Sequence, residues 1–138
     1  MTRNRRGFSL VEMMVVIGVF GLLTALSMPA FSRYVRSNRV STSVSRFAAD
    51  LQMARSTAIA NGRVIRVATT GNTYQVTDIS TGNVLHNRTL ERGVEVQVNT
   101  QVQFYPWGMA DAANFNVGCT TSGYKAIRLL PTGVVEVD

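Results

Sequence analysis

A long apolar segment near the N terminus is the feature that most constrains this chain of 138 residues. The run from residue 13 to residue 31 contains no Asp, Glu, Lys or Arg. Roughly 20 predominantly apolar residues suffice to span a bilayer as a helix. A secretory signal places a shorter apolar core before a small-residue cleavage site, whereas here a basic leader ending in Gly7 comes first. We therefore expect residues 8–31 to form a helix that can span a membrane.

The start of this segment carries a motif that is typical of one protein family. Residues 5–12, RRGFSLVE, resemble the prepilin signal of type IV pilins and type II secretion pseudopilins. In that family a prepilin peptidase cleaves after the glycine and methylates the new N-terminal amine. The resemblance implies that residues 1–7 are a cleaved leader peptide. It also implies cleavage between Gly7 and Phe8, with Phe8 becoming an N-methylated phenylalanine.

Glu12 is an acid beside this apolar run, and its charge needs a partner there. An unpaired carboxylate at the centre of a bilayer costs on the order of 2.5–3.5 kcal/mol. After cleavage the α-amine of Phe8 lies one helical turn away, and the amine of a neighbouring subunit is the alternative partner. A snorkelling acid without a specific role is the other interpretation. We expect Glu12 to act in filament assembly more than in membrane insertion.

The sequence predicts that the helix continues, with one apolar face, to about residue 60. Apolar residues recur at the helical spacings of three and four: Val40, Val44, Phe47, Leu51, Ala54 and Ala58. Asp50 and Arg55 fall largely off this stripe. Asn61 and Gly62 mark the end of the helix. Pro29 should kink it, because proline lacks an N–H and clashes with the preceding turn.

After residue 62 the pattern changes to short strands separated by turn residues. We expect antiparallel strands over residues 64–69, 74–77, 84–90, 94–98, 102–105, 125–130 and 134–137. Residues 108–123 are interpreted as a small-residue loop around a short run at residues 115–117. The fold class is thus α+β and pilin-like, a long N-terminal helix whose first half spans the membrane and whose second half packs on antiparallel sheet. The expected domain, residues 32–138, joins the helix half 32–60 to the β-region 63–138.

Three further segments narrow the resemblance: residues 54–59, residues 104–108 and residues 131–133 are similar to the GspH/FimT group of minor pilins and pseudopilins. The resemblance implies a minor pilin or pseudopilin, a structural subunit that helps to initiate or cap assembly of a type IV pilus. A GspH-like pseudopilin of the type II secretion system is the alternative. Both use the same signal and domain plan, so the sequence leaves the choice open.

The resemblance also implies a location and a set of partners. The location is the bacterial inner membrane, with a single pass and a periplasmic C-terminal domain, and then the pilus or pseudopilus. The partners are prepilin peptidase, other pilins or pseudopilins through the N-terminal helix, the inner-membrane assembly platform, and the lipid bilayer before assembly. Charge counting does not settle the orientation, because three arginines on each side of the apolar segment balance: Arg3, Arg5, Arg6 and Arg33, Arg36, Arg39.

DNA is a further partner to consider, since the formal charge is +6. Some members of the group bind DNA through a basic motif directly after the closing glycine. Here Gly133 is followed by Val134, Val135 and Glu136, so that site does not carry over. The remaining basic candidates on the domain are interpreted as a solvated face: Arg63, Arg66, Arg88, Arg92, Lys125 and Arg128. A DNA-uptake or adhesive binding module at the filament tip is the alternative from another functional class.

The sequence offers little for catalysis. His86 is the only histidine and Cys119 the only cysteine, so a metal-ligand set is absent and no intrachain disulfide can form. A nucleophilic pair of His86 and Cys119 is conceivable, but we favour a buried structural thiol. We expect no catalytic residues, no metal, no cofactor and no enzymatic activity.

Trp107 and Met109, in the loop after residue 104, are the candidate partner contacts, because apolar groups on a loop tend to anchor partners. The alternative, which we favour slightly from the sequence, is that they cap the core. Arg33, Arg36 and Arg39 are expected on one side of the helix, where they hold lipid headgroups or acids of neighbouring subunits. A simple solvated face fits them equally well.

Overall fold

The computed structural model describes residues 8–138, with the side chains of residues 26–30 excepted. Gly7 and the rest of the leader, and the side chain of Pro29, lie outside the described residues. The cleavage site and the kink therefore stay predictions. The chain divides into two compact units, residues 1–35 and residues 36–138.

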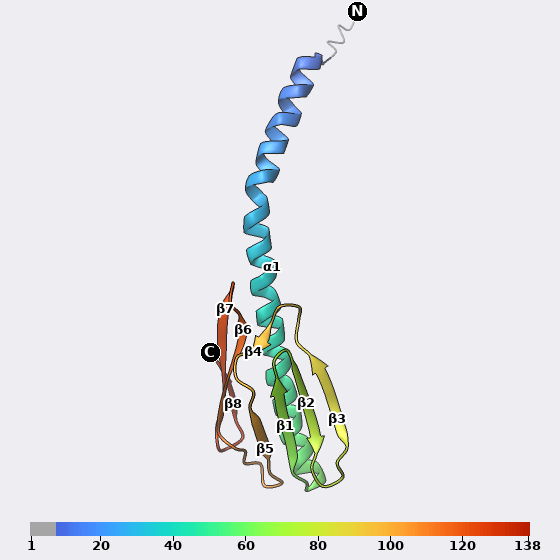
Figure 1. The fold of residues 1–138 in the computed structure, drawn as a ribbon, viewed down its shortest axis with the longest axis vertical. Coiled ribbons are helices and arrows are strands. Elements are labelled where there is room, and N and C mark those ends of the chain that lie inside the picture. Colours follow the sequence, from blue (N-terminus) through green and yellow to red (C-terminus); the bar gives the residue numbers. More distant parts are fainter. Residues whose placement is uncertain (1–7) are drawn as a thin grey trace, which may run out of the picture. The chain divides into compact units, whose positions relative to one another are not determined.

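One helix, α1 (Leu10–Asn61), runs through 52 residues (Figure 1). It begins after Ser9, whose Oγ accepts a hydrogen bond from the backbone N–H of Glu12 at 3.2 Å and so satisfies a free N–H of the first turn. It ends before Gly62, which takes the left-handed conformation (φ 63°) that commonly closes a helix. The predicted extent of the helix, from about residue 8 to residue 60, is confirmed.

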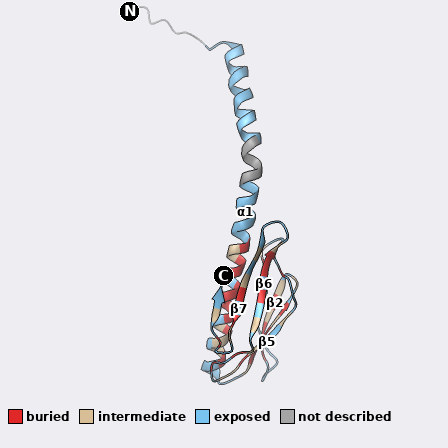
Figure 2. Ribbon diagram, turned by 90° about the vertical axis from the view of Figure 1, so that its left-hand side faces the viewer, coloured by how far each residue is buried: buried red, intermediate tan, exposed pale blue. Residues whose placement is uncertain are grey.

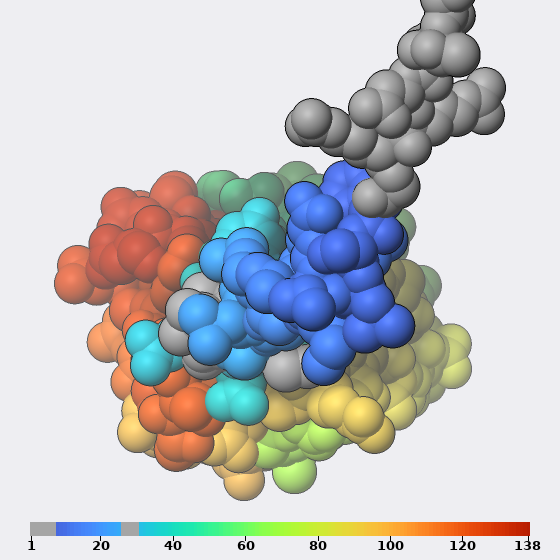
Figure 3. Space-filling model, turned by 90° about the horizontal axis from the view of Figure 1, so that it is seen from above, coloured from blue at the N-terminus to red at the C-terminus, as the bar shows by residue number. Residues whose placement is uncertain are grey.

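All residues from 8 to 25 are exposed, and Figure 3 shows this segment in shades of blue. Large apolar side chains dominate this segment; Leu10, for example, is 76% exposed and Ile17 70%. Over the residues that the structure describes, no helix combines the length and the apolar character that crossing a membrane requires. The span expected over residues 8–31 stays a prediction.

The second half of α1 buries the predicted stripe. All six of its residues are at most 3% exposed: Val40, Val44, Phe47, Leu51, Ala54 and Ala58. Asp50, which the sequence placed largely off the stripe, is also buried. Figure 2 shows this buried face of the helix in red beside the buried residues of the strands. The amphipathic pattern is therefore confirmed, and the prediction for Asp50 is wrong.

Eight strands form two antiparallel sheets of four. The first has the order β3-β2-β1-β5 and consists of β1 (Ile65–Thr70), β2 (Thr73–Asp78), β3 (Val84–Thr89) and β5 (Gln101–Phe104). The second has the order β4-β6-β7-β8 and consists of β4 (Glu95–Val96), β6 (Ala113–Cys119), β7 (Gly123–Leu129) and β8 (Val135–Val137). The predicted closing hairpin is β7 with β8, and the α+β fold class is confirmed.

The interpretation of residues 108–123 as a loop is wrong, because seven of them form β6. Phe115 and Val117 face the core while Asn114 and Asn116 are exposed, as the alternation of a strand requires. Asn and Gly disfavour strands intrinsically. Gly118 is nevertheless required there, since a Cβ on it would lie 2.2 Å from the carbonyl oxygen of Gly123 in the paired strand.

The predicted strand over residues 94–98 is also shorter than expected. Only Glu95 and Val96 are in β4. Val94 and Val96 are buried, but Val98 is 62% exposed. The backbone N–H of Gln97 still bonds to the carbonyl oxygen of Asn116 in β6, after which the chain leaves the sheet. The predicted alternation fails at its last position for that reason.

The ring of Phe47 joins the helix to both sheets. Its centroid lies 4.8 Å from that of Tyr74 in β2 and 5.1 Å from that of Phe115 in β6, the second pair in an edge-to-face arrangement. Such pairs add about 0.5–1.5 kcal/mol beyond the apolar area they bury. Phe47 is 0% exposed, so its side chain has no route to solvent. The core of the second unit is thus built around one helical side chain.

Replacing Phe47 by alanine should lower the free energy of unfolding by about 3–5 kcal/mol, because the change removes both ring contacts and leaves a cavity. Thermal and urea unfolding of the full chain in a neutral detergent, followed by circular dichroism, would measure the loss. Tyr34→Ala is the control, since Tyr34 is 71% exposed and should change stability by no more than about 0.5 kcal/mol. Equal effects of the two changes would contradict this description of the core.

Candidate functional site

The N-terminal end of α1 presents the residues expected to act in processing and assembly. Phe8 is 73% exposed, and Glu12 is exposed in the first turn of the helix. A carboxylate there is favoured by the positive end of the helix dipole. Among the described residues, Glu12 has no ion-pair partner. The negative charge of Glu12 is therefore available to a cation from outside the described residues.

Three segments singled out from the sequence, residues 54–59, 104–108 and 131–133, meet at the side chain of Arg55. Its Nε donates a hydrogen bond to the carbonyl oxygen of Gly108 at 3.0 Å, and one terminal nitrogen donates to the carbonyl oxygen of Thr132, also at 3.0 Å. We call this arrangement the Arg55 clamp. The planar guanidinium suits it, because its donors point in fixed directions and reach two loops at once.

Two glycines make the clamp possible. Gly108 has a φ of +86° and Gly133 a φ of +75°, which side chains strongly disfavour. A Cβ on Gly133 would lie 2.3 Å from the carbonyl oxygen of Gly108 and 2.7 Å from Nε of Arg55. Any larger residue would therefore separate the two loops and displace the arginine. Sequence reasoning placed Arg55 off the apolar stripe and missed this role, although the three motifs were the available signal.

The clamp holds a loop that exposes Trp107 and Met109. Trp107 is 69% exposed and Met109 48%, so the interpretation that they cap the core is wrong. The indole stacks on the ring of Tyr105, with centroids 5.0 Å apart and planes 6° from parallel. The hydroxyl of Tyr105 donates to Oδ1 of Asp111 at 3.2 Å, and this hydrogen bond raises the pKa of Tyr105. The loop thus holds a large apolar side chain in a fixed position at the surface.

Most basic residues considered for DNA already have partners within the domain. Arg63 pairs with Asp78 at 3.1 Å, Arg88 with Asp50 at 3.2 Å and Arg128 with Asp138 at 3.5 Å. Lys125 donates to the hydroxyl of Ser41 at 3.2 Å. Each paired guanidinium has part of its charge neutralised. These residues do not form a free basic row for a phosphate backbone.

Two of these acids are buried polar groups that the sequence did not predict. The hydroxyl of Tyr74 donates to Oδ2 of Asp50, and burial, together with Asp50, raises the pKa of Tyr74. Burial opposes ionisation of Asp78, but hydrogen bonds from Arg63 and from the backbone N–H of Ser80 outweigh it and lower the pKa of Asp78. Asp50 thus joins the helix to Tyr74 and Arg88, and Asp78 joins the end of β2 to Arg63.

The structure does not bring the sequence-derived chemical candidates together. His86 is in β3 of the first sheet, whereas Cys119 ends β6 of the second. Cys119 is half-buried and packs against the core, so the thiol is less buried than the structural thiol that the sequence favoured. Hydrogen bonding by the Ser122 hydroxyl lowers the pKa of the Cys119 thiol. Within the described part of the chain, no three His, Cys, Asp or Glu residues are grouped as metal ligands.

Arg55→Met should lower the free energy of unfolding by about 2 kcal/mol, because two carbonyl groups lose charged donors while the apolar stem of the side chain is kept. Arg128→Met, at an exposed ion pair, should change it by no more than about 1 kcal/mol. Chemical unfolding of both variants as full chains in neutral detergent would measure the difference. If Arg55→Met lowers the free energy of unfolding no more than Arg128→Met does, the Arg55 clamp does not stabilise the fold.

Comparison with known families gives two matches. The family described as "Type II transport protein GspH" matches residues 43–133, and the "Prokaryotic N-terminal methylation motif" matches residues 2–28. The first match begins in the buried half of α1 and ends at the second glycine of the Arg55 clamp. It covers well over half of the chain. The second includes the prepilin-like signal and most of the apolar segment.

Curated relatives include fimbrial proteins. The type IV major fimbrial protein FimA of Dichelobacter nodosus is 32% identical over 83 residues, which cover 58% of this chain and 44% of that protein. The prepilin peptidase-dependent protein D of Escherichia coli (strain K12) is 48% identical over 33 residues, covering 24% of this chain and 23% of that protein. The matches thus span less than half the length of these relatives.

A solved structure shares the fold. The type IV minor pilin FimU of Pseudomonas aeruginosa (strain PAO1) aligns with a TM-score of 0.63 at 17% identity, covering 76% of this chain and 92% of that one. At this identity the likeness concerns the fold. It confirms the pilin-like arrangement of a long helix and antiparallel sheets.

Proposed function

Because the chain belongs to the family of the type II transport protein GspH, we propose that this pilin-like subunit helps to initiate or cap the assembly of a type IV pilus. The observation that carries the proposal is the exposed apolar segment of residues 8–25, next to a domain with a minor pilin fold. Exposed apolar surface on this scale marks a site that a membrane or other proteins cover. A filament of bundled helices provides such a cover.

Processing and membrane anchoring precede assembly in this proposal. Prepilin peptidase cleaves between Gly7 and Phe8 and methylates Phe8, as the N-terminal methylation motif supports. Residues 8–31 then anchor the subunit in the bacterial inner membrane, with residues 32–138 in the periplasm. The assembly platform extracts the subunit, and the apolar segment moves from lipid to the helices of other pilins. The work of this subunit is structural, in line with its family.

Glu12 sets the register of the subunit in the filament. Its carboxylate has no ion-pair partner among the described residues, and an apolar surrounding strengthens its attraction to a cation. The methylated amine at Phe8, of the same chain or of a neighbour, supplies that cation. An axial misplacement of neighbouring helices would leave the two charges unpaired in apolar surroundings, and this penalty selects one register.

The second candidate is a pseudopilin of the type II secretion system, which the match to the type II transport protein GspH family favours. Both candidates need the same anchor, the same processing and the same helix packing. They differ in the machine that the subunit joins. A DNA-uptake module is less favoured, because Arg63, Arg88 and Arg128 are paired with acids.

Trp107 and Met109 are the proposed contacts with another pilin subunit. The Arg55 clamp holds their loop against the end of α1, so little conformational freedom is lost when a partner binds. A large aromatic side chain, displayed by a fixed loop, has the character of an interface anchor. This contact is separate from the helix packing that Glu12 controls.

Deletion of the gene should abolish or strongly reduce surface pili, because a priming subunit is needed before the filament can grow. Wild type should restore them, while Glu12→Ala should not. Glu136→Ala, which removes an exposed acid from β8, is the matched control and should restore pili. The measurement is the count of pili by electron microscopy.

Normal piliation of the deletion strain with loss of type II secretion would transfer the proposal to the pseudopilus. Full rescue by Glu12→Ala would remove Glu12 from the assembly mechanism. An immunoblot of the membrane fraction distinguishes an assembly defect from a protein that is not inserted.

Trp107→Ala should leave the melting temperature within about 3 °C of wild type, because the side chain is largely exposed and only its stacking on Tyr105 is lost. The same change should reduce crosslinking to other pilins and the number of pili at least several-fold. Thr81→Ala, at an exposed turn, serves as the control. A large loss of stability with Trp107→Ala would mean that this residue belongs to the core. Unchanged piliation would exclude Trp107 as a contact with another pilin subunit.

A further inference from the structure

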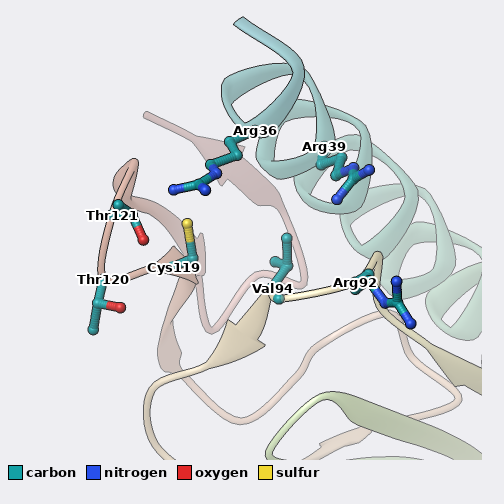
Figure 4. A pocket seen from close by; sticks show the side chains of 8 residues that line it. Arg36, Arg39, Arg92, Val94, Cys119, Thr120 and Thr121 are labelled. Atoms are coloured by element: carbon teal, nitrogen blue, oxygen red, sulfur yellow. The ribbon is translucent and has the colours of Figure 1, made fainter. Parts of the chain in front are cut away.

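A pocket of about 360 Å³ lies in the second unit between α1, the segment before β4, and the turn that joins β6 to β7. Figure 4 shows Arg36 reaching towards Thr121 and Cys119, with Arg39 and Arg92 on the other side of Val94. The three guanidinium groups come from two parts of the chain that are far apart in sequence. The fold therefore concentrates positive charge here in a way that no short motif indicates.

The charge of this pocket is not balanced by the domain itself. No acid lines it, and among the described residues Arg36, Arg39 and Arg92 make no ion pair. Four other arginines of the domain differ in this respect, since each pairs with a carboxylate: Arg46, Arg63, Arg88 and Arg128. Like charges held around one cavity repel each other unless an anion enters. The pocket is thus suited to a negatively charged ligand.

The donors around the pocket suit a phosphate better than a carboxylate. Guanidinium groups bind either anion through two parallel hydrogen bonds. Thr120 and Thr121, in the turn between β6 and β7, line the pocket on a different side. A tetrahedral phosphate presents oxygens in several directions and can use guanidinium donors from both the helix and the segment before β4, whereas a planar carboxylate presents two oxygens in one plane.

The position of the arginines in the sequence indicates where this phosphate comes from. Phe31 and Tyr34, 69% and 71% exposed, precede Arg36 in α1 and follow the apolar segment. Aromatic side chains gather at the level of lipid headgroups, and basic side chains that follow a membrane segment bind anionic headgroups. We propose that the pocket binds the phosphate of an anionic phospholipid headgroup while the subunit is in the membrane. This inference rests on the membrane anchoring in the proposed function.

Cys119 provides a direct readout of the pocket, because it lines the cavity and is the only cysteine in the chain. The lowered pKa of its thiol keeps it reactive towards alkylating reagents. The full chain in a neutral detergent would be alkylated with N-ethylmaleimide, an uncharged reagent that the arginines do not attract. The quantity to measure is the concentration of phosphatidylglycerol in mixed micelles that halves the alkylation rate.

Phosphatidylglycerol should slow alkylation, and diacylglycerol, which lacks the phosphate, should not. Arg39→Gln and Arg92→Gln should each raise the half-protecting concentration about fivefold. Arg128→Gln removes the same charge from an exposed ion pair away from the pocket and should leave it unchanged. Because each variant is compared with itself at zero lipid, changes in intrinsic thiol reactivity cancel. Equal protection in wild type and both pocket variants would overturn the proposal.

Further measurements distinguish the possible sources of the phosphate and test the proposed membrane anchoring separately. Equal protection of Cys119 by glycerol 1-phosphate, at the same concentration as phosphatidylglycerol, would overturn the proposal of a lipid ligand and favour a free phosphate. Stronger protection by duplex DNA than by phosphatidylglycerol would overturn it and favour nucleic acid. Flotation of the full chain with phosphatidylcholine vesicles tests anchoring alone. If the chain floats with the vesicles but phosphatidylglycerol does not protect Cys119, the pocket proposal fails and the proposed membrane anchor stands. If phosphatidylglycerol protects Cys119 but the chain does not float, the proposed anchor fails, and a membrane lipid is then excluded as the source of the phosphate.

Discussion

The aromatic contacts of Phe47 hold the second unit together, because this one ring reaches Tyr74 in the first sheet and Phe115 in the second. Neither sheet is large enough to enclose a core alone, and each needs a cover for its apolar face. The helix covers both at once through the stripe that Phe47 centres. Every other feature of the domain, including the two loops at the end of the helix and the pocket, is positioned by this packing.

At the end of the helix, hydrogen bonding replaces apolar packing. The Arg55 clamp fixes the loop at Gly108 to the loop at Thr132, and the left-handed glycines allow the backbones to approach. These are the segments by which the sequence resembled the GspH/FimT group, so the motif has a physical meaning. The clamp fixes the loop, and Trp107, inside the same segment, is exposed on it.

Much of the fold could be predicted from the sequence because its signals are local. The helical stripe and the end at Gly62 follow from spacing and backbone conformation, and both are confirmed. β6 could not be predicted, because Asn114, Asn116 and Gly118 have low strand propensity and the strand forms only by pairing with β4 and β7. Likewise, neither the burial of Asp50 nor the pocket between Arg39 and Arg92 follows from one segment, since each depends on residues brought together by tertiary packing.

The two open sheets leave four edge strands, and their lengths matter under the proposed assembly, which brings subunits close together. β4, β5 and β8 contain two, four and three residues, too few to template a long pairing with another chain. β3 has six, but its register on β2 shifts between Val76 and Thr77, and Arg88 adds charge to it. Short or irregular edges oppose strand-to-strand aggregation. In the proposed filament, such edges leave crowded subunits to associate through their helices rather than through amyloid-like extension of their sheets.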